Sequence, residues 1–283
     1  MGQLLFGAVI ISFSAVFVKL AGVPPAVSAF YRMFFGGLTL LGLLAVTGNL
    51  AAARRALAWP ALVCAVFFSS DLFCWHLSIN YIGPGLATLV GNFQVFLVTV
   101  VAAVTARRVP KAGFLAGMAV AVAGLYLVVG RGFAGQTPEF RLGVGYGLAT
   151  ALFYGLFILT LKKAVTDQGR AGPMAAMAVL SLAGAAMLGP VAVLGGDSLG
   201  LPTATSVWSL VALGVIGQGI GWLSISHGLA GARPALAGLV LLLQPTLSYV
   251  WDVLFFGKPT GPVELAGVAL ALAGIYVGST QRS

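Results

Sequence analysis

Long apolar stretches, separated by short breaks rich in proline, glycine or charge, dominate the chain from end to end. A helix needs about 20 mainly apolar residues to cross a bilayer. The pattern predicts an all-α membrane protein. Pro84 and Pro234 fall where first helical turns are expected, and proline is tolerated there because its N–H would have no partner. The ten predicted spans lie at about 3–20, 26–47, 57–80, 84–105, 112–130, 142–162, 172–194, 205–228, 234–255 and 263–280.

Composition also points to lipid as the main solvent. Of 283 residues, 60% are hydrophobic and only 7% are charged, which leaves no room for a separate soluble domain. The net charge of +9 has the sign that binds nucleic acid, but the basic residues occur singly or in pairs between apolar runs. We therefore expect the lipid bilayer, and no nucleic acid, as a partner.

The basic residues predict an orientation. With a cytoplasmic N-terminus, the inner loops and tail would hold ten of them and the outer loops four, as the positive-inside rule requires. This favours both termini in the cytoplasm and a location in the inner (plasma) membrane. The inner set is Arg54, Arg55, Arg107, Arg108, Lys111, Lys162, Lys163, Arg170, Arg233 and Arg282; the outer set is Lys19, Arg131, Arg141 and Lys258.

The chain contains an internal repeat. Residues 84–126 match residues 234–276 without a gap, at a shift of 150 that pairs Gln94 with Gln244. The predicted domains are therefore two five-helix repeats, 1–131 and 141–280. An odd number of spans in each repeat forces opposite orientations, and inverted repeats of this kind are typical of transporters that work by alternating access.

Several segments together resemble the drug/metabolite transporter superfamily, EamA type, over both repeats. They are FYRMFFGGL around Arg32, NYIGPGLATLVGNFQ, LLLQPTLSYV, and the closing LAGMAVAVAGLYLVV and LAGVALALAGIYVGS. The length and the polar and aromatic residues within the spans are similar to those of the YddG-type bacterial amino-acid exporters. The resemblance implies a secondary or facilitative exporter of amino acids, aromatic or otherwise neutral, and of similar small metabolites. An exporter of organic cations or drugs is the alternative, and a channel is a third possibility.

Missing motifs narrow the function further. The chain has no G-x-x-x-x-G-K-[ST], no H-E-x-x-H and no G-x-S-x-G, so neither an ATP-driven pump nor a membrane enzyme is expected. We predict no catalytic residue, no metal ligand and no cofactor.

Arg32 and Asp71 are the two charged residues that lie well inside predicted spans, away from the span ends. Burying such a group costs about 2.5 to 3.5 kcal/mol on insertion scales, so each should face a cavity or a partner. One interpretation is a structural ion pair between the second and third helices. The other is substrate binding, with Asp71 meeting an amine or carrying a proton and Arg32 meeting a carboxylate.

Uncharged polar and aromatic residues complete the predicted substrate site. Gln94 and Gln244 occupy symmetric positions in mid-span, where their amides either contact substrate or join helices. An aromatic wall would accept an apolar side chain or a cation, although Trp75 also suits a headgroup-level anchor and His76 a packing role. The full predicted set is Arg32, Asp71, Trp75, His76, Asn92, Gln94, Gln218, Trp222 and Gln244.

Gly91 and Pro245 are the predicted hinges, with a static kink as the alternative. Gln94 is followed by valine rather than proline, so a bend in the fourth span would have to depend on glycine. Glycine pairs such as Gly274 and Gly278 allow helices to approach closely, inside the molecule or between copies, which leaves a monomer or a weak homodimer. Asp252, near an outer span end, is expected to be structural.

Overall fold

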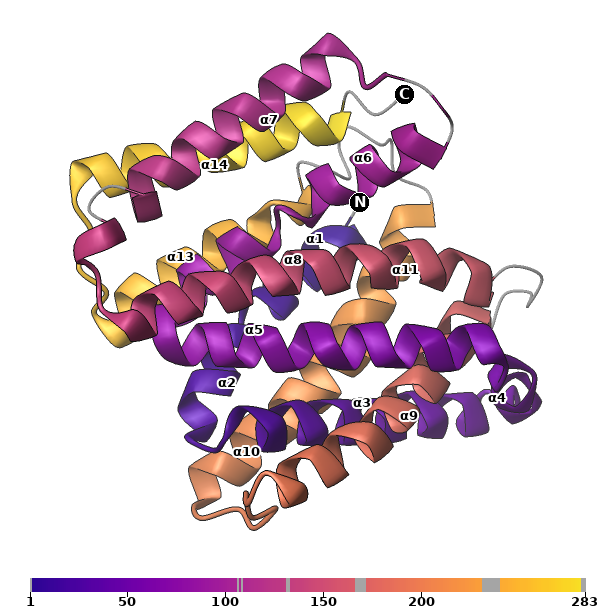
Figure 1. The fold of residues 1–283 in the computed structure, drawn as a ribbon. Helices are drawn as coiled ribbons and strands as arrows, with labels where there is room; N and C mark the ends of the chain where they lie inside the picture. The colour runs from indigo at the N-terminus through magenta and orange to yellow at the C-terminus, as the bar shows by residue number, and fades with distance from the viewer. Residues whose placement is uncertain are drawn as a thin grey trace.

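The computed structural model describes residues 2–105, 107, 109–130, 133–165, 172–230 and 240–280. Within these residues every regular element is helical, in agreement with the predicted class (Figure 1). The elements are α1 (Gly2–Ser12), α2 (Ser14–Ala21), α3 (Pro25–Val46), α4 (Leu50–Ala56), α5 (Trp59–Gly91), α6 (Gln94–Thr105), α7 (Ala112–Leu125), η1 (Tyr126–Gly130), η2 (Phe133–Gly135), α8 (Pro138–Val165), α9 (Gly172–Leu194), α10 (Ala204–Ala212), η3 (Leu213–Gly221), α11 (Trp222–Ala230), α13 (Leu243–Phe256) and α14 (Pro262–Thr280).

Eight stretches of the described residues are long and apolar enough to cross a membrane. One of them, Trp59–Thr105, has 47 residues and combines the predicted third and fourth spans. The predicted eighth span consists of α10, the π-helical η3 and α11 in succession. The predicted ninth span, with Pro234, begins outside the described residues.

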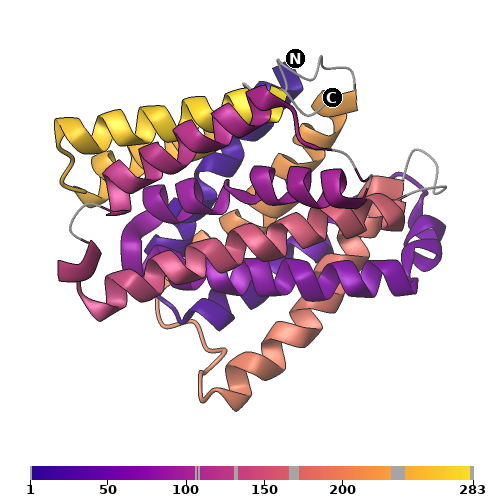
Figure 2. The same cartoon turned by 45° about the horizontal axis from the view of Figure 1, so that its top comes forward.

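The helices of the two repeats pack in matching pairs (Figure 1 and Figure 2). In one pair, α5 lies along α8. In the matching pair, η3 and α11, which are the counterparts of α5, lie along α1. α3 packs against α9, which occupies the equivalent place in the second repeat. The bundle is therefore built from contacts between repeats, and space enclosed by α5, α8, α11 and α1 is shared by both.

α7 and α14 form a pair at one edge of the bundle, joined through glycines (Figure 2). A Cβ on Gly117 would lie 2.8 Å from the carbonyl oxygen of Gly274, and a Cβ on Gly267 would lie 2.9 Å from that of Gly124. A shift of 150 residues converts the first contact into the second. Because low numbers in α7 meet high numbers in α14, these equivalent helices run antiparallel.

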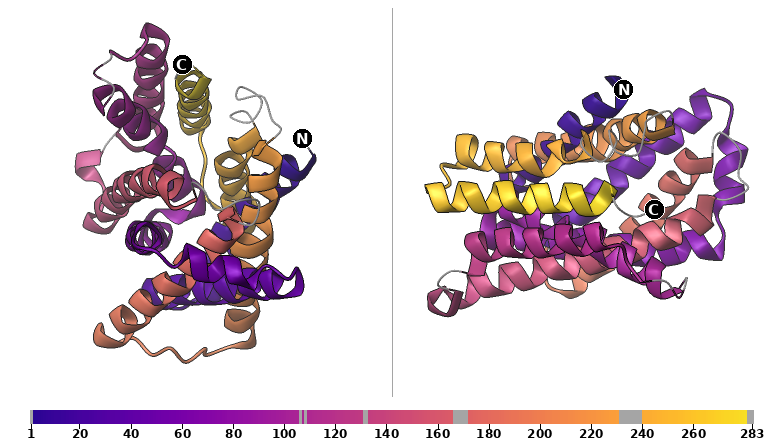
Figure 3. Two further views of the ribbon diagram at one scale, coloured as in Figure 1. Left: turned by 90° about the vertical axis from the view of Figure 1, so that its right-hand side faces the viewer. Right: turned by 90° about the horizontal axis from the view of Figure 1, so that it is seen from above.

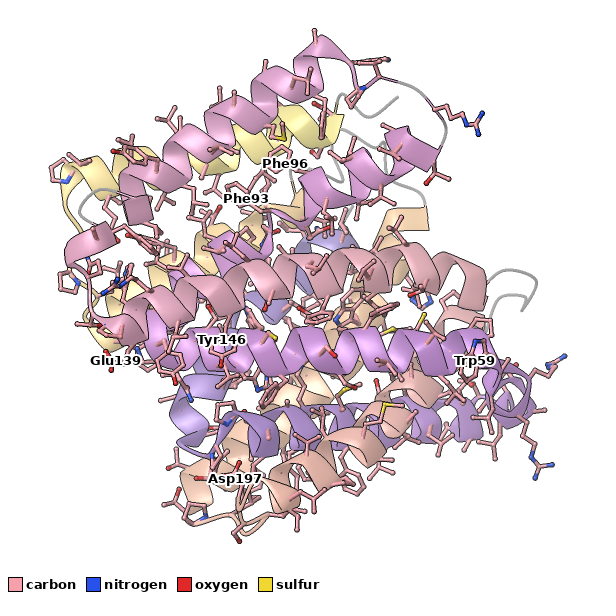
Figure 4. All side chains as sticks on the ribbon, viewed as in Figure 1. Trp59, Phe93, Phe96, Glu139, Tyr146 and Asp197 are labelled. Carbon is pink, nitrogen blue, oxygen red and sulfur yellow. The ribbon has the colours of Figure 1, made fainter. Side chains whose placement is uncertain are left out.

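The glycines predicted for close approach therefore join helices inside the molecule. Behind this pair, Phe93 and Phe96 fill the space toward the rest of the bundle (Figure 4). The Phe96 ring stands 5.7 Å from that of Phe114 on α7. The Phe96 ring also packs against Gly278 of α14, since a Cβ on Gly278 would lie 2.7 Å from Cε1 of this ring. Loss of these small residues would separate α7 and α14.

Helix breaks occur at equivalent positions in the two repeats. α5 ends at Gly91, the turn at Asn92 and Phe93 follows, and α6 then begins. In the second repeat the turn is at Leu242, the position equivalent to Asn92, and α13 begins immediately after it. The predicted bend beside Gly91 is therefore present.

Pro245 lies in the first turn of α13, where proline is tolerated because its N–H would have no partner within that helix. Pro245 therefore follows a turn at Leu242, and whether this turn flexes stays a prediction.

A further break lies inside α5, at Gly83, whose φ of 85° and ψ of 163° are accessible to glycine without strain. Pro84 then starts a new helical segment, as predicted for a first helical turn. The described ends of the chain, Gly2 and Thr280, lie toward the end of the bundle that carries α4 (Figure 1 and Figure 3). We call it the terminal end and the opposite one the distal end.

Candidate functional site

A cavity of about 720 Å³ lies between the two repeats, within the range of about 300 to 1,000 Å³ typical of small-molecule sites. It extends from the middle of α5 to the last turns of α8 and α14, where Leu161, Ser279 and Thr280 line it. It therefore reaches toward the terminal end. Eight of the predicted residues line it, namely Arg32, Asp71, Trp75, Gly91, Asn92, Gln94, Trp222 and Gln244.

Arg32 is held on the cavity wall by residues of both repeats. Its Nε donates to Oε1 of Gln218 at 3.2 Å, and Nε2 of Gln218 donates to Ser181 at 3.2 Å. The guanidinium lies over the ring of Trp75, 5.3 Å from its centroid, at a distance where a cation is attracted by the ring face. Nη1 of Arg32 is buried and has no hydrogen-bond partner among the described residues.

Asp71 lines the same cavity and is 5% exposed. Among the described residues its carboxylate makes no hydrogen bond and no ion pair within 4.0 Å. The only ion pairs there are Lys19 with Asp252 and Lys258 with Glu264. The structural ion pair between Arg32 and Asp71, one of the two interpretations of the sequence, is not formed in this conformation. Both charged residues line the cavity.

The symmetric amides reach the same cavity, as the repeat predicted. Gln94 is 9% exposed, and its Oε1 has no hydrogen-bond partner among the described residues. Gln244 is half-buried. Asn92 donates to the carbonyl oxygen of Thr88 at 2.8 Å and so also stabilises the end of α5. The wall therefore presents amides from both repeats.

Trp75 is 7% exposed and faces the cavity, which disagrees with a role as a headgroup-level anchor. Trp222 stands on the opposite repeat at the centre of an aromatic cluster. Its ring is edge-on to Phe68 at 6.3 Å, to Phe157 at 6.3 Å and to Tyr154 at 6.4 Å, a favourable arrangement for aromatic pairs. Phe68 and Phe157 stack at 4.5 Å.

Three of these aromatic residues, Phe68, Tyr154 and Phe157, were missed by the sequence analysis. Tyr154 and Phe157 lie on α8, where Thr150, Tyr154, Phe157, Ile158 and Leu161 all line the cavity. Their spacing places them on a single helical face, so the periodicity of this polar and aromatic stripe was the signal that would have found them.

Three predicted residues lie behind the cavity wall rather than on it. His76 is completely buried, and Nδ1 is 2.6 Å from the hydroxyl of Ser28. Gln218 is completely buried and contacts Arg32, so any effect on substrate acts through that side chain. Pro245 follows a lining residue but does not line the cavity itself. His76 and Gln218 therefore do not line the cavity, and the role of Pro245 as a hinge stays a prediction.

The described residues contain no group of three His, Cys, Asp or Glu side chains close enough to hold a metal ion. The functional groups that line the cavity are one carboxylate, one guanidinium, several amides and a cluster of aromatic rings. Such a set binds small polar molecules that carry an apolar part.

An all-helical membrane protein whose repeated halves enclose a polar and aromatic cavity has the architecture of a small-molecule transporter. Comparison with known families agrees. A model of the EamA-like transporter family matches residues 2–130 and again residues 141–280. The chain belongs to the EamA-like transporter family, and it is a multi-pass transporter of small molecules.

A solved structure described only as "Crystal structure of protein" has the same fold. It is 20% identical to this chain and superposes with a TM-score of 0.70, over 98% of this chain and 96% of that one. At this identity the likeness shows the fold alone. No curated protein matches the chain significantly.

Proposed function

We propose that this protein exports amino acids, aromatic or otherwise neutral, and similar small metabolites across the plasma membrane by alternating access. The observation that carries the proposal is the pair of buried charged residues, Arg32 and Asp71, which line one cavity and form no ion pair within 4.0 Å among the described residues. A zwitterion supplies the two opposite charges that such a pair lacks.

The carboxylate of the substrate would bind Arg32. Planar guanidinium groups match carboxylates with two parallel hydrogen bonds. Gln218 and the ring of Trp75 fix the guanidinium from two sides, so Gln218 acts as a positioning residue. Its fixed orientation supports recognition of one carboxylate in one place.

The amine would bind Asp71, and the amides of Asn92, Gln94 and Gln244 would orient the rest of the polar group. The side chain would lie against the aromatic cluster around Trp222, which favours aromatic and large apolar groups. A cavity of about 720 Å³ also leaves room for substrates of different size.

The proposed topology has ten spans, with both termini in the cytoplasm, in two inverted repeats at 1–131 and 141–280. Two observations support it. α7 and α14 make an antiparallel contact, and the first and last described residues both lie toward the terminal end of the bundle (Figure 3). The 47-residue stretch is more than twice the length that one span needs. In this topology the cavity reaches toward the cytoplasm, and Gly91 and the turn before Pro245 would flex during opening.

The experiment that tests the proposal is counterflow in proteoliposomes with labelled amino acids, sugars and organic cations, with and without a pH gradient. A carrier exchanges labelled for unlabelled substrate and accumulates label transiently, whereas a channel does not. We expect amino-acid counterflow by the parent protein. Its absence for every amino acid would overturn the substrate assignment while leaving the family unchanged.

Two variants separate an amino-acid exporter from an exporter of organic cations, the second function that Asp71 and the aromatic cluster favour. Arg32→Gln and Asp71→Asn should each lower amino-acid transport by at least about tenfold, since each removes a charge-assisted hydrogen bond of about 1.5 to 3 kcal/mol. Transport of an amino-acid amide, which lacks the carboxylate, should be unchanged by Arg32→Gln. If only Asp71→Asn had an effect, a cation exporter would be favoured.

Asp197→Asn is the matched control for Asp71→Asn. Asp197 lies in the connection between α9 and α10, outside the cavity (Figure 4). The Asp197→Asn variant should transport amino acids at the parental rate.

A further inference from the structure

The distal end of the cavity is closed by direct contact between the helical segment that restarts at Pro84 and α13. A Cβ on Gly85 would lie 2.8 Å from the Cα of Tyr249, so the two backbones touch. Neither residue lines the cavity. Thr88, one turn further along, does line it and is 3% exposed. Access from the distal end therefore requires this contact to separate.

Asp252 ties three elements together at this contact. It is 2% exposed, and its Oδ2 accepts the backbone N–H of Gly85 at 3.1 Å. Its Oδ1 lies 3.8 Å from Nζ of Lys19, at the end of α2. The same Nζ stands 4.4 Å from the centroid of the Phe256 ring. α2, α5 and α13 therefore meet at one carboxylate.

The hydrogen bond between Asp252 and the Gly85 N–H depends on the closed state. The first N–H groups of a helix have no partner within it, and a negative charge is favoured at that terminus. The break at Gly83 creates such a terminus inside α5, and Asp252 satisfies it. If α13 moved away from α5, the buried N–H of Gly85 would lose its acceptor and Asp252 would lose this donor unless water replaced them.

The first repeat has no equivalent acid. A shift of 150 residues brings Asp252 to Ala102, which carries no group that could cap a helix or pair with a cation. In a transporter with inverted repeats, the opposite state would use the equivalent residues of the other repeat. The carboxylate of Asp252 therefore has no counterpart at the equivalent position of the first repeat.

We propose that Asp252, Lys19 and the Gly85 N–H form a latch that holds the distal end closed and biases the resting protein toward the state open at the terminal end. This inference rests on the proposed alternating access. It assigns Asp252, expected from the sequence to be only structural, a role in setting the equilibrium between the two states, while it touches no substrate.

Two single-cysteine reporters test the latch independently of any substrate. Cys64 and Cys74 are buried and unpaired, and they are first replaced by Cys64→Ser and Cys74→Ala. Thr88→Cys then reports opening at the distal end, and Ser279→Cys, which replaces a lining residue of α14, reports opening at the terminal end. A membrane-impermeant thiol reagent is applied from each side of sealed vesicles.

We expect Asp252→Asn to raise labelling at position 88 from the distal side by at least about threefold and to lower labelling at position 279 from the other side. A shift between two states moves the two reporters in opposite directions. General loosening of the structure would raise both, and that result would overturn the latch. Unchanged labelling at both positions in folded protein would overturn it as well.

Lys19→Gln is the second variant, because the Lys19 side chain is 37% exposed and its loss leaves the Gly85 N–H capped. We expect labelling at positions 88 and 279 to change in the same directions as in Asp252→Asn, but by about twofold, because a partly exposed ion pair contributes little. If Asp252→Asn failed to fold, Lys19→Gln would decide, and unchanged labelling would reject the proposal. Glu139→Gln is the control, since Glu139 is an exposed acid in the first turn of α8 that takes no part in this contact. Failure of amino-acid counterflow would change neither labelling result.

Discussion

The two repeats break their central helices at equivalent positions, yet the side chains beside the breaks differ. In the first repeat the turn is Asn92 and Phe93, and in the second it is Leu242. The equivalent of Asp252 is Ala102, and the equivalents of the bulky Phe93 and Phe96 are Leu243 and Thr246. Backbone geometry is shared by the two repeats, whereas the chemistry is distributed unequally between them.

This difference separates two requirements of a transporter with inverted repeats. The contacts that allow the repeats to exchange conformations must be similar in both, and they depend on glycines and turns. The groups that bind a substrate without symmetry of its own must differ. Accordingly the two buried charges of the cavity, Arg32 and Asp71, both come from the first repeat, whereas Trp222 and the aromatic residues of α8 come from the second.

The largest effect is expected where the symmetric backbone contact is broken. A Cβ on Gly274 would lie 2.5 Å from the carbonyl oxygen of Gly117, and this backbone atom cannot rotate away. Gly274→Leu should therefore destabilise the fold by about 3 kcal/mol, the upper end of the usual cost of overpacking. Thermal unfolding in detergent, followed by size-exclusion chromatography, would measure the loss.

Gly145→Leu is the control for this variant. Gly145 lies on α8, and no other atom lies within 4 Å of the place that a Cβ would take, so the same substitution meets open space. It should leave the unfolding temperature unchanged or raise it slightly, because leucine has the higher helix propensity. Equal losses for the two variants would show that the α7–α14 contact does not depend on close approach.

A smaller effect is expected at the symmetric amides. Gln94 is nearly buried and Gln244 is half-buried, so the two equivalent positions are unequal in this conformation. Gln94→Ala should lower the ratio of maximal transport rate to KM by about tenfold, and Gln244→Ala by about threefold, as expected for losing one hydrogen bond of about 0.5 to 1.5 kcal/mol. Initial rates of counterflow would measure both. Parental rates in the double variant would exclude both amides from the substrate site.

The sequence predicted the helical class and the presence of two repeats because both depend on periodic features. Apolar runs mark helices, and the shift of 150 residues placed Gln94 and Gln244 at equivalent depths, where the structure has them facing one cavity. Arg32 and Asp71 were found because ionisable groups inside spans are rare and need a polar environment.

The sequence was less informative about which face of a helix meets the cavity. Asp71 and Trp75, four residues apart, share a face, but His76 is turned by about 100° from Trp75 and points to Ser28 instead. Gln218 lies in the π-helical η3, whose wider turn changes the register of side chains, so a regular periodicity misplaces it. The periodicity of α8 marks the face that carries Tyr154 and Phe157, but only the packing of α8 along α5 places that face at the cavity.

The smallest effect is expected at Gly91, the proposed hinge of the first repeat. A Cβ on Gly91 would lie 2.9 Å from Cγ2 of Thr150 on α8, a side-chain contact that can adjust. Gly91→Ala should therefore slow counterflow by roughly twofold to threefold, since overpacking of this size costs about 1 kcal/mol and stiffens the turn between α5 and α6. Gly42→Ala, with open space around the added methyl group, is the control.

Thr150→Ser separates crowding from lost flexibility at this hinge, because serine lacks the methyl group that an alanine at position 91 would meet. If crowding is the cause, the double variant should regain the parental rate. If the rate stays low, the slower transport reflects the backbone freedom of glycine itself, since alanine narrows the conformations open to the turn. The second outcome would make Gly91 a hinge by conformation, whereas the first would make it only a site of close helix packing. Equal rates for Gly91→Ala and the parent would leave the bend as a static feature of the first repeat.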